Sequence, residues 1–226
     1  MQDTTSNPDR TPLERWFSRR VVTKLPQVVI GSSLLGFGVA LMASGRLGFG
    51  PWSVLAEGVG EQAGIGLGTA DILLGIPILF GWLIVREQPG IGTLVSALGV
   101  GLMINAGRAI LPEPQAMWVR LPMTSLGVIV LGIGVALYLA ADLGPGPRDG
   151  LTTGLHHRLG WSIRLIRTII EGLVLVLGML LGGTVGVGTL LVAFGVGHVI
   201  QAGLRIFDRE GRVMQAKPPA RPDLAG

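Results

Sequence analysis

A chain of 226 residues that is 49% hydrophobic and only 14% charged is far more apolar than a soluble domain of this size needs, and its mean hydropathy of +0.59 agrees. The absence of cysteine excludes a disulfide framework, a thiolate zinc site and an iron–sulfur cluster. The formal charge of +4 does not indicate nucleic-acid binding, because the basic residues lie at the ends of apolar runs, as is typical of membrane proteins.

The N-terminal segment is polar up to residue 12, and we expect that part to be disordered. Leu13, Trp16, Phe17 and Val21 then recur at helical spacing, which predicts a short helix on the cytoplasmic membrane surface. A solvated leader is the alternative. The first 24 residues lack an apolar core with a small-residue cleavage site, so we expect no cleaved signal peptide.

Apolar runs that approach the ~20 residues needed to cross a bilayer predict six spans, at 27–46, 68–85, 90–111, 124–142, 163–183 and 187–207. The segments 51–63 and 147–159 are too short to cross and are predicted as half-helices, either re-entrant or interfacial. The predicted divisions are a tail with an interfacial helix, a first three-span repeat, an outer linker, a second three-span repeat and a disordered cytoplasmic tail: 1–26, 27–111, 112–123, 124–207 and 208–226.

The distribution of basic residues predicts the orientation. With both termini in the cytoplasm, only Arg46, Arg108 and Arg120 of the 18 lysines and arginines lie outside, which leaves 15 on the inner side. Because cytoplasmic loops carry the excess of lysine and arginine, we predict a multi-pass protein with N- and C-termini inside.

An internal repeat appears when the sequence is shifted by 96 residues. Leu35–Gly107 then aligns without a gap onto Leu131–Gly203, with about a third of the positions identical. Each half contains three predicted crossings, an odd number, so the second half is inverted relative to the first. The predicted fold is therefore an all-α membrane protein with six transmembrane helices as two inverted three-helix repeats, each with an extra short half-helix. Such repeats are typical of secondary transporters.

Two related turns mark equivalent places in the two halves. Their shared residues are glycines and a proline: Gly48, Gly50 and Pro51 in the first copy, Gly144, Gly146 and Pro147 in the second. Pro147 suits the first position of a helix. The first copy continues with Trp52 and Ser53 and the second with Arg148 and Asp149, so we expect any chemically specific site in the second half.

Charged residues after the second turn form the candidate site. Arg148 beside the N-terminus of a helix, with Arg164 and Arg167 on the next helix, would suit an anion. The alternative is that these arginines reach lipid phosphates and set the topology. Glu171 lies four residues after Arg167, so an ion pair is sterically easy.

The depth of Glu171 depends on where its span begins. It lies about 12 Å inside the membrane if the span begins at Ile163, and at the interface if the span begins at Thr168. Asp71 corresponds by the repeat to Arg167, and the two are candidates for paired gates or for solvated helix ends.

Polar residues on the third and sixth spans are further candidates. Asn105 and Gln201 occupy equivalent positions, as substrate-facing amides or as hydrogen-bonding groups between helices. His198 shares a face with Gln201, and with Glu171 it would make a proton-coupled pair, although a histidine that hydrogen-bonds within the core is the commoner case. Small residues recur every fourth position on the spans, for example Ser32, Gly36, Ala40 and Ser44, and predict close helix packing.

Four stretches together resemble a known family: LGFGPWSVL (47–55), LGPGPRDGL (143–151), RLIRTIIE (164–171) and GGTVGVGTLL (182–191). They resemble the YczE/YyaS/YitT-type bacterial integral membrane proteins, whose biochemical activity is largely uncharacterised. The resemblance covers nearly everything between the first and last spans. It implies a multi-span protein of the bacterial cytoplasmic (inner) membrane.

The function expected from the sequence is a small-molecule transporter that works by alternating access, with an anionic or zwitterionic solute and proton coupling. A non-transporting scaffold or regulator is the alternative, and a passive channel a weaker one. No nucleophile–base pair, nucleotide loop or metal cluster is evident, so we expect no enzyme, cofactor, metal or nucleic-acid partner. The expected partners are the bilayer and an unknown solute, with a homo-oligomer left open.

Overall fold

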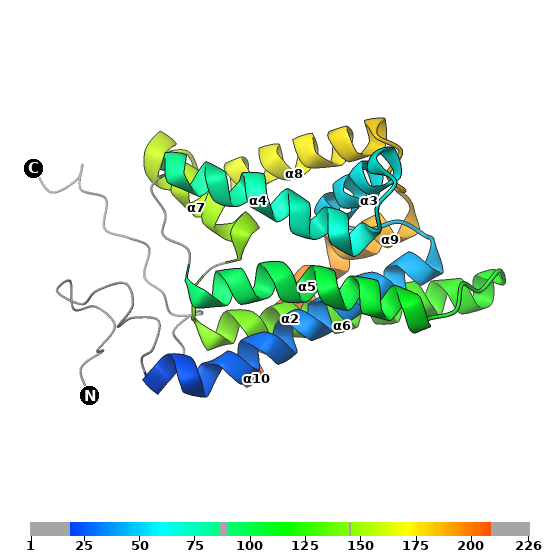
Figure 1. The fold of residues 1–226 in the computed structure, drawn as a ribbon, viewed down its shortest axis with the longest axis horizontal. Coiled ribbons are helices and arrows are strands. Elements are labelled where there is room, and N and C mark those ends of the chain that lie inside the picture. The colour runs from blue at the N-terminus through cyan, green and yellow to red at the C-terminus, as the bar shows by residue number, and fades with distance from the viewer. Residues whose placement is uncertain (1–18, 86–89, 145, 209–226) are drawn as a thin grey trace, which may run out of the picture.

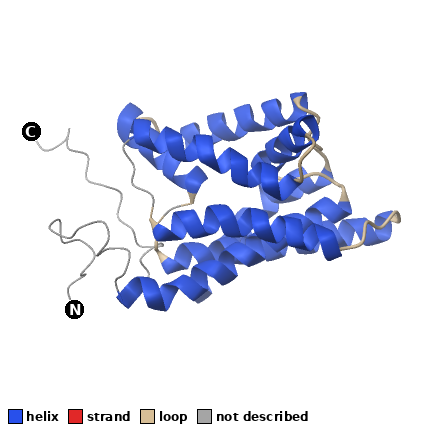
Figure 2. Cartoon of the chain, in the orientation of Figure 1, coloured by secondary structure: helices blue, strands red, loops and turns tan. Residues whose placement is uncertain are grey.

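The structure is a computed structural model that describes residues 19–85, 90–144 and 146–208. Throughout these ranges the regular elements are helices and no strand occurs (Figure 2). In chain order they are α2 (Arg19–Gly45), α3 (Pro51–Ala63), α4 (Leu67–Val85), α5 (Ile91–Ile110), α6 (Met117–Ala141), α7 (Pro147–Leu159), α8 (Ile163–Leu180), α9 (Val187–Leu191), the π-helix η1 (Val192–Val196) and α10 (Gly197–Phe207).

Four helices are long and apolar enough to cross a membrane: Val21–Gly45, Ile91–Ile110, Met117–Ala141 and Val187–Phe207. Helices α3 and α4 are bent by 107° at their junction, and counting this pair as one span raises the number to five. Helix α8 is not among them, because three of its 18 residues, Arg164, Arg167 and Glu171, are charged. The described residues are therefore all-helical with four to five candidate membrane spans, and the arrangement of six spans remains a prediction.

Two spans are longer than predicted from their apolar runs. Helix α2 begins at Arg19 and continues through Pro26, and α6 begins at Met117 and continues through Pro122. A count of apolar residues identifies only the part of each helix that is long enough to cross a bilayer. The helical backbone also includes the residues before Pro26 in α2 and before Pro122 in α6. The predicted surface helix starting at Leu13 lies outside the described residues except for its last positions, which belong to α2; the predicted disordered tail lies outside them except for Asp208.

The two short helices begin and end with the same signals. Helix α7 begins at Pro147, 96 residues after Pro51 begins α3, and in both the preceding glycine is extended. Proline is favoured in the first turn because its missing N–H would be unpaired there. The helices end at Gly64 and Gly160, with φ of 67° and 68°, the left-handed conformation that glycine adopts readily.

The helices form two layers (Figure 1). The first layer contains α2, α5, α6 and α10, in which α2 packs on α5 and α6, and α10 packs on α6. The second layer contains α3, α4, α7 and α8, in which each short helix packs on a long helix of the other half, α3 on α8 and α7 on α4. The two halves of the chain are therefore interleaved in both layers.

The centre of the first layer is an antiparallel contact between α2 and α6, made through glycines. A Cβ added at Gly38 would meet the backbone of Leu131 at 2.5 Å, and one at Gly134 would meet Leu35 N at 2.4 Å. Gly31 and Gly127 make the same kind of approach. Because only glycine permits backbones to come this close, these four positions fix the distance between the halves.

The four-residue stripes of small residues serve a different contact, within each half. On α2, Gly36 lies against Val100 of α5 and Ala40 against Gly107. On α6, Gly132 lies against Val199, and Ala136 lies against Gly203 of α10. The close packing predicted from the stripes is thus present, and each stripe joins the first and third long helices of its own half.

Candidate functional site: a cavity between the layers

A cavity of about 870 Å³ lies between the two layers and is lined by residues from both halves of the chain. Most of its lining is aliphatic, contributed by the long helices of both layers. The charged lining residues are Asp71, Arg148, Asp149, Arg167 and Glu171. A volume of this size is within the range of small-molecule sites, about 300–1,000 Å³.

An ion pair joins the two halves across the cavity. Arg148 Nη2 at the start of α7 lies 2.5 Å from Asp71 Oδ1 on α4. The Asp71 side chain is only 7% exposed, and Arg148 is the charged partner that compensates its burial. The guanidinium of Arg148 also lies over the Trp52 ring of α3, 5.1 Å from its centroid, which is within the range of a cation–π contact. Asp71 and Arg167, the predicted gate pair, therefore do not pair with each other.

The second half contributes two more polar contacts. The hydroxyl of Tyr138 on α6 donates a hydrogen bond to Asp149 Oδ2 at 3.3 Å. On α8, Arg167 Nε lies 2.8 Å from Glu171 Oε1, so the ion pair that the i,i+4 spacing allows is present. Helix α8 begins at Ile163 with Ser162 as its N-cap, whose hydroxyl accepts a hydrogen bond from Leu165 N.

The turns before α3 and α7 hold these side chains in place. Gly48 and Gly144 have φ of +97° and +117°, and each turn contacts the start of a long helix in the other half. Gly188 N donates to Leu47 O at 2.7 Å, and Gly92 N donates to Leu143 O at 3.1 Å. The charged start of α7 is thereby fixed to the first half of the chain.

Most of the predicted site residues line this one cavity. They are Gly50, Pro51, Trp52, Ser53, Asp71, Gly146, Pro147, Arg148, Asp149, Arg167, Glu171 and Gln201. Five candidates lie outside this lining. Gly48 and Gly144 belong to the turns before α3 and α7, and Arg164 and His198 are exposed. Asn105 binds α4, where its Oδ1 accepts from Gly68 N at 3.1 Å. His198 Nδ1 lies 2.9 Å from Phe194 O, so His198 and Glu171 are not brought together as a pair.

Two residues of the site were not predicted. Tyr138 supplies the hydroxyl to Asp149, and Trp82 Nε1 donates to Pro147 O at 2.8 Å with its ring against Gly150. Tyr138 is the only tyrosine in the chain and lies inside an apolar span, which is a usable signal for a polar contact in the membrane. Trp82 had no comparable signal.

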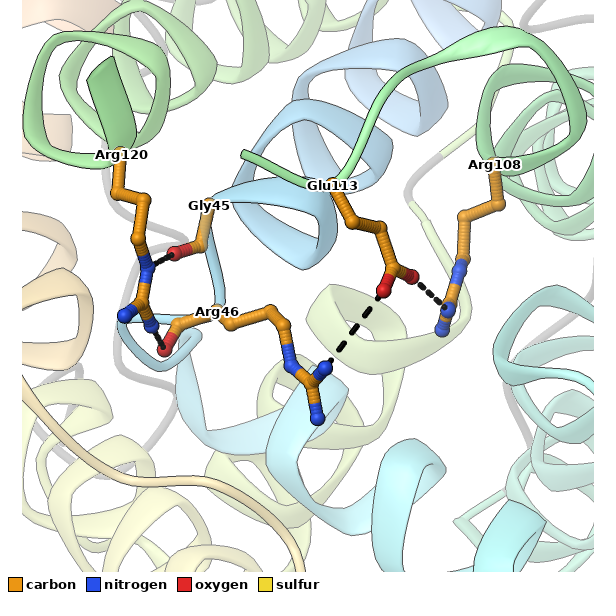
Figure 3. A network of polar contacts seen from close by, with 5 residues as sticks. All are labelled: Gly45, Arg46, Arg108, Glu113 and Arg120. Atoms are coloured by element: carbon orange, nitrogen blue, oxygen red, sulfur yellow. Dashed lines mark hydrogen bonds and ion pairs between the residues drawn. The ribbon is translucent and has the colours of Figure 1, made fainter. Parts of the chain in front are cut away.

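A polar network lies where helices α2 and α5 end (Figure 3). It contains all three arginines predicted to be outside. Arg120 donates to Gly45 O at 2.8 Å and to Arg46 O at 2.7 Å, which satisfies carbonyls at the end of α2. Glu113 lies between Arg46 at 3.6 Å and Arg108 at 3.2 Å. A smaller cavity of about 430 Å³ adjoins it, lined by Glu57, Glu61, Asn105 and Arg108 among others.

The large cavity between the layers is closed where α4 packs on α5 and open between α8 and α10. Helix α4 packs on α5, where a Cβ added at Gly101 would meet Gly68 O at 2.4 Å. Among the described residues, α8 makes no comparable contact with α10, and a Cβ added at Gly197, the repeat equivalent of Gly101, would meet nothing within 4 Å. Arg167 on this side is 61% exposed although it lines the cavity.

The fold and cavity define a helical membrane protein with a mixed-charge site between two interleaved halves. Residues 22–205 match a family described as "Family of unknown function (DUF6198)", and the chain belongs to this family. Within the described residues no group of three histidine, aspartate or glutamate side chains is placed to hold a metal ion.

Similar proteins include an "Uncharacterized protein" of Haemophilus influenzae, 37% identical over 78% of this chain and 81% of its own length. The "Uncharacterized membrane protein YczE" of Bacillus subtilis is 33% identical over 77% of this chain and 82% of its own. The "Uncharacterized protein YyaS" of Bacillus subtilis is 26% identical over 80% and 92%. These names agree with the resemblance stated from the sequence. No solved structure matches the chain.

Proposed function

We propose that this protein is a small-molecule transporter of the bacterial inner membrane that binds its solute in the cavity between the layers. The observation that carries the proposal is the cavity itself, a site of about 870 Å³ whose charged residues come from both halves of the chain. A scaffold has no need of buried charges around an internal space, and ionisable groups at membrane depth are costly unless they have a function.

The relation between the halves supports alternating access. Helices α3 and α7 begin 96 residues apart, as do α4 and α8, and α2 and α6 end 96 residues apart. The α2–α6 contact is antiparallel. Inverted repeats let a transporter exchange the conformations of its two halves, which exposes a central site to each side in turn. On this proposal there are six spans, with α3 and α7 as half-helices.

The proposed orientation has both termini in the cytoplasm. It rests on the distribution of lysine and arginine. It is supported by the gathering of Arg46, Arg108 and Arg120 in one network at the end of the molecule where α2 and α5 end. No chemical step is part of the proposal.

The alternative is a regulatory protein that binds a solute in the cavity without moving it across the membrane. The ion pair between Asp71 and Arg148 is the observation that favours this alternative, because it joins the two halves at the site. The two functions differ in whether the halves exchange conformations.

Single cysteines test the proposal without background, because the chain has no native cysteine. Ala56 and Thr152 are repeat equivalents: Ala56 is fully buried, whereas Thr152 lines the cavity. Alternating access predicts that Thr152→Cys reacts with a water-soluble maleimide in this state and Ala56→Cys does not, and that the reactivities change in opposite directions as cells are energised. Reactivities that stay constant in energised and de-energised membranes would favour the regulatory protein.

Glu171→Gln tests proton coupling. If Glu171 carries the coupling proton, the variant loses acidification of the lumen of proteoliposomes in response to a solute pool extracted from cells, while Glu61→Gln, in the smaller cavity, keeps it. Equal proton movement in both variants would remove Glu171 from the mechanism.

A further inference from the structure

The cavity has an unbalanced set of charges. Three carboxylates, of Asp71, Asp149 and Glu171, face two guanidiniums, of Arg148 and Arg167, which leaves a net charge of −1. Both arginines already have a carboxylate partner, at 2.5 Å and 2.8 Å. An anionic solute would have to displace one of these partners, whereas a cationic group adds to the network and neutralises it.

Asp149 is the carboxylate best placed to receive a cation. It lies at the N-terminal turn of α7, and its Oδ2 accepts a hydrogen bond from the hydroxyl of Tyr138. The hydrogen bond from Tyr138 fixes the position of this oxygen, and Asp149 also lines the cavity. In a low-dielectric space a net negative charge attracts a cation far more strongly than it would in water.

Beyond the charged groups the cavity is apolar. Its wall there consists of aliphatic side chains from both halves, among them Val39, Val100, Leu131, Val135, Val196 and Ile200. A small hydrophilic ion would leave this surface in contact with water. A molecule with an apolar body and a cationic head would cover both parts of the lining.

The open side of the cavity faces the apolar surface of the protein. It lies between α8 and α10. The outward faces of these helices carry exposed apolar residues such as Leu173, Val176 and Ile206, and Phe194 of the adjoining η1 is exposed as well. In a bilayer these side chains contact acyl chains, so the gap between α8 and α10 opens to lipid. A solute that enters there has already partitioned into the membrane.

A residue difference accompanies the open side. On the closed side, Gly68 lets α4 cross α5 closely, and a Cβ at Gly68 would meet Gly101 O at 2.1 Å. The residue at the equivalent place on α8 is Arg164. A long side chain there needs more room than glycine does, and in this conformation α8 makes no contact with α10 comparable to that of α4 with α5.

We propose that the cavity binds an amphipathic organic cation, an apolar molecule with an amine or onium head, which enters from the bilayer between α8 and α10. This inference rests on the proposed function for the site and adds the class of solute. Asp149 binds the cationic head, and the aliphatic lining contacts the body.

Two probe ions of the same shape and opposite charge test which sign of charge the cavity binds. The protein in nanodiscs is titrated with tetraphenylphosphonium and with tetraphenylborate, and empty nanodiscs give the background partition. The expected result is saturable binding of tetraphenylphosphonium above background and none of tetraphenylborate. Asp149→Asn is expected to weaken binding about tenfold or more. Asp142→Asn is the matched control, because Asp142 lies outside the cavity lining in the left-handed conformation that asparagine also tolerates.

The entry route is tested with two open glycines. An added Cβ meets nothing within 4 Å at Gly197, which lines the cavity, or at Gly172, which does not. Gly197→Phe is expected to slow the association of tetraphenylphosphonium at least several-fold, and Gly172→Phe to leave it unchanged.

Equal binding of the two ions, or unchanged binding by Asp149→Asn, would overturn the inference. So would a stable dimer cross-linked through α8 and α10, since a second copy would then close the gap. Such a failure leaves the cysteine-reactivity result standing, because that test measures exchange between the halves without this probe. Conversely, binding of the cation with constant reactivity supports the solute class and removes transport.

Discussion

The crossing of α4 over α5 and the gap between α8 and α10 occupy equivalent places in the two halves, yet one is closed and the other open. Both halves have a glycine on the helix of the first layer, Gly101 in α5 and Gly197 in α10. The difference lies on the helix of the second layer, which has Gly68 in α4 and Arg164 in α8. A duplicated framework can thus give two different conformations when a single small residue at a helix crossing is replaced by a large charged one.

Exchange of these two residues should have the largest effect. Gly68→Arg places a long side chain where a Cβ would already meet Gly101 O at 2.1 Å, so α4 must separate from α5. We expect loss of most folded protein in detergent, measured as the monodisperse fraction in size-exclusion chromatography.

Arg164→Gly is the reciprocal change and should leave the folded fraction within error of the unchanged protein, because Arg164 is exposed and lies outside the cavity. A Gly68→Arg variant that stays monodisperse and thermally stable would mean that the α4–α5 contact does not hold the layers together.

The ion pair between the halves should have the next largest effect. Asp71→Asn leaves Arg148 in the cavity without its carboxylate, and because the Arg148 side chain is 36% exposed the cost should be about 1–3 kcal/mol, below that of a fully buried pair. The double variant Asp71→Asn with Arg148→Gln should recover much of this loss, and thermal unfolding of the four proteins in a double-mutant cycle measures the coupling.

The Arg167–Glu171 pair provides the comparison, because it lies within one helix and both side chains are more than a third exposed. Its coupling should be below about 0.5 kcal/mol. If the two cycles give equal coupling energies, the pair between Asp71 and Arg148 does not join the halves energetically.

A smaller difference in stability is expected between alanine substitutions at Gly101 and at Gly197. Gly101→Ala forces a shift of Gly68 or Ile72, whose atoms would lie 2.4 Å from the new Cβ, and should lower stability by about 1–3 kcal/mol. Gly197→Ala meets nothing and should be neutral or stabilising by about 0.5–1 kcal/mol, since alanine favours the helix. Melting temperatures of the two variants in one detergent check this, and equal shifts would contradict the asymmetry.

The sequence predicts local elements and pairings well where a local signal exists. The segments 51–63 and 147–159 are helical over the predicted residues, because proline and glycine define their ends. The Arg167–Glu171 pair follows from helical spacing alone. Without such a signal, α6 begins at Met117, before its predicted apolar run, and α2 is already helical at Arg19, the first described residue.

Long-range contacts were harder to predict. The repeat relates Asp71 to Arg167, but Asp71 pairs with Arg148. The reason is that α7, which carries Arg148, packs on α4 of the other half. Tyr138 reaches Asp149 from a span that otherwise reads as apolar. Asn105 and Gln201 are equivalent in sequence, yet only Gln201 lines the large cavity, since the α4–α5 crossing covers Asn105.

The glycine contact between α2 and α6 also has a consequence for biosynthesis. Gly31 and Gly38 on α2 have their partners, Gly127 and Gly134, 96 residues later in the chain. At about 5–20 residues per second, a ribosome takes roughly 5–20 s to make that interval. Helix α2 therefore remains in the insertion machinery or in lipid with its narrow glycine face uncovered for that time. The first half can bury the other face of α2 against α5 earlier, before the glycines of α6 have been made.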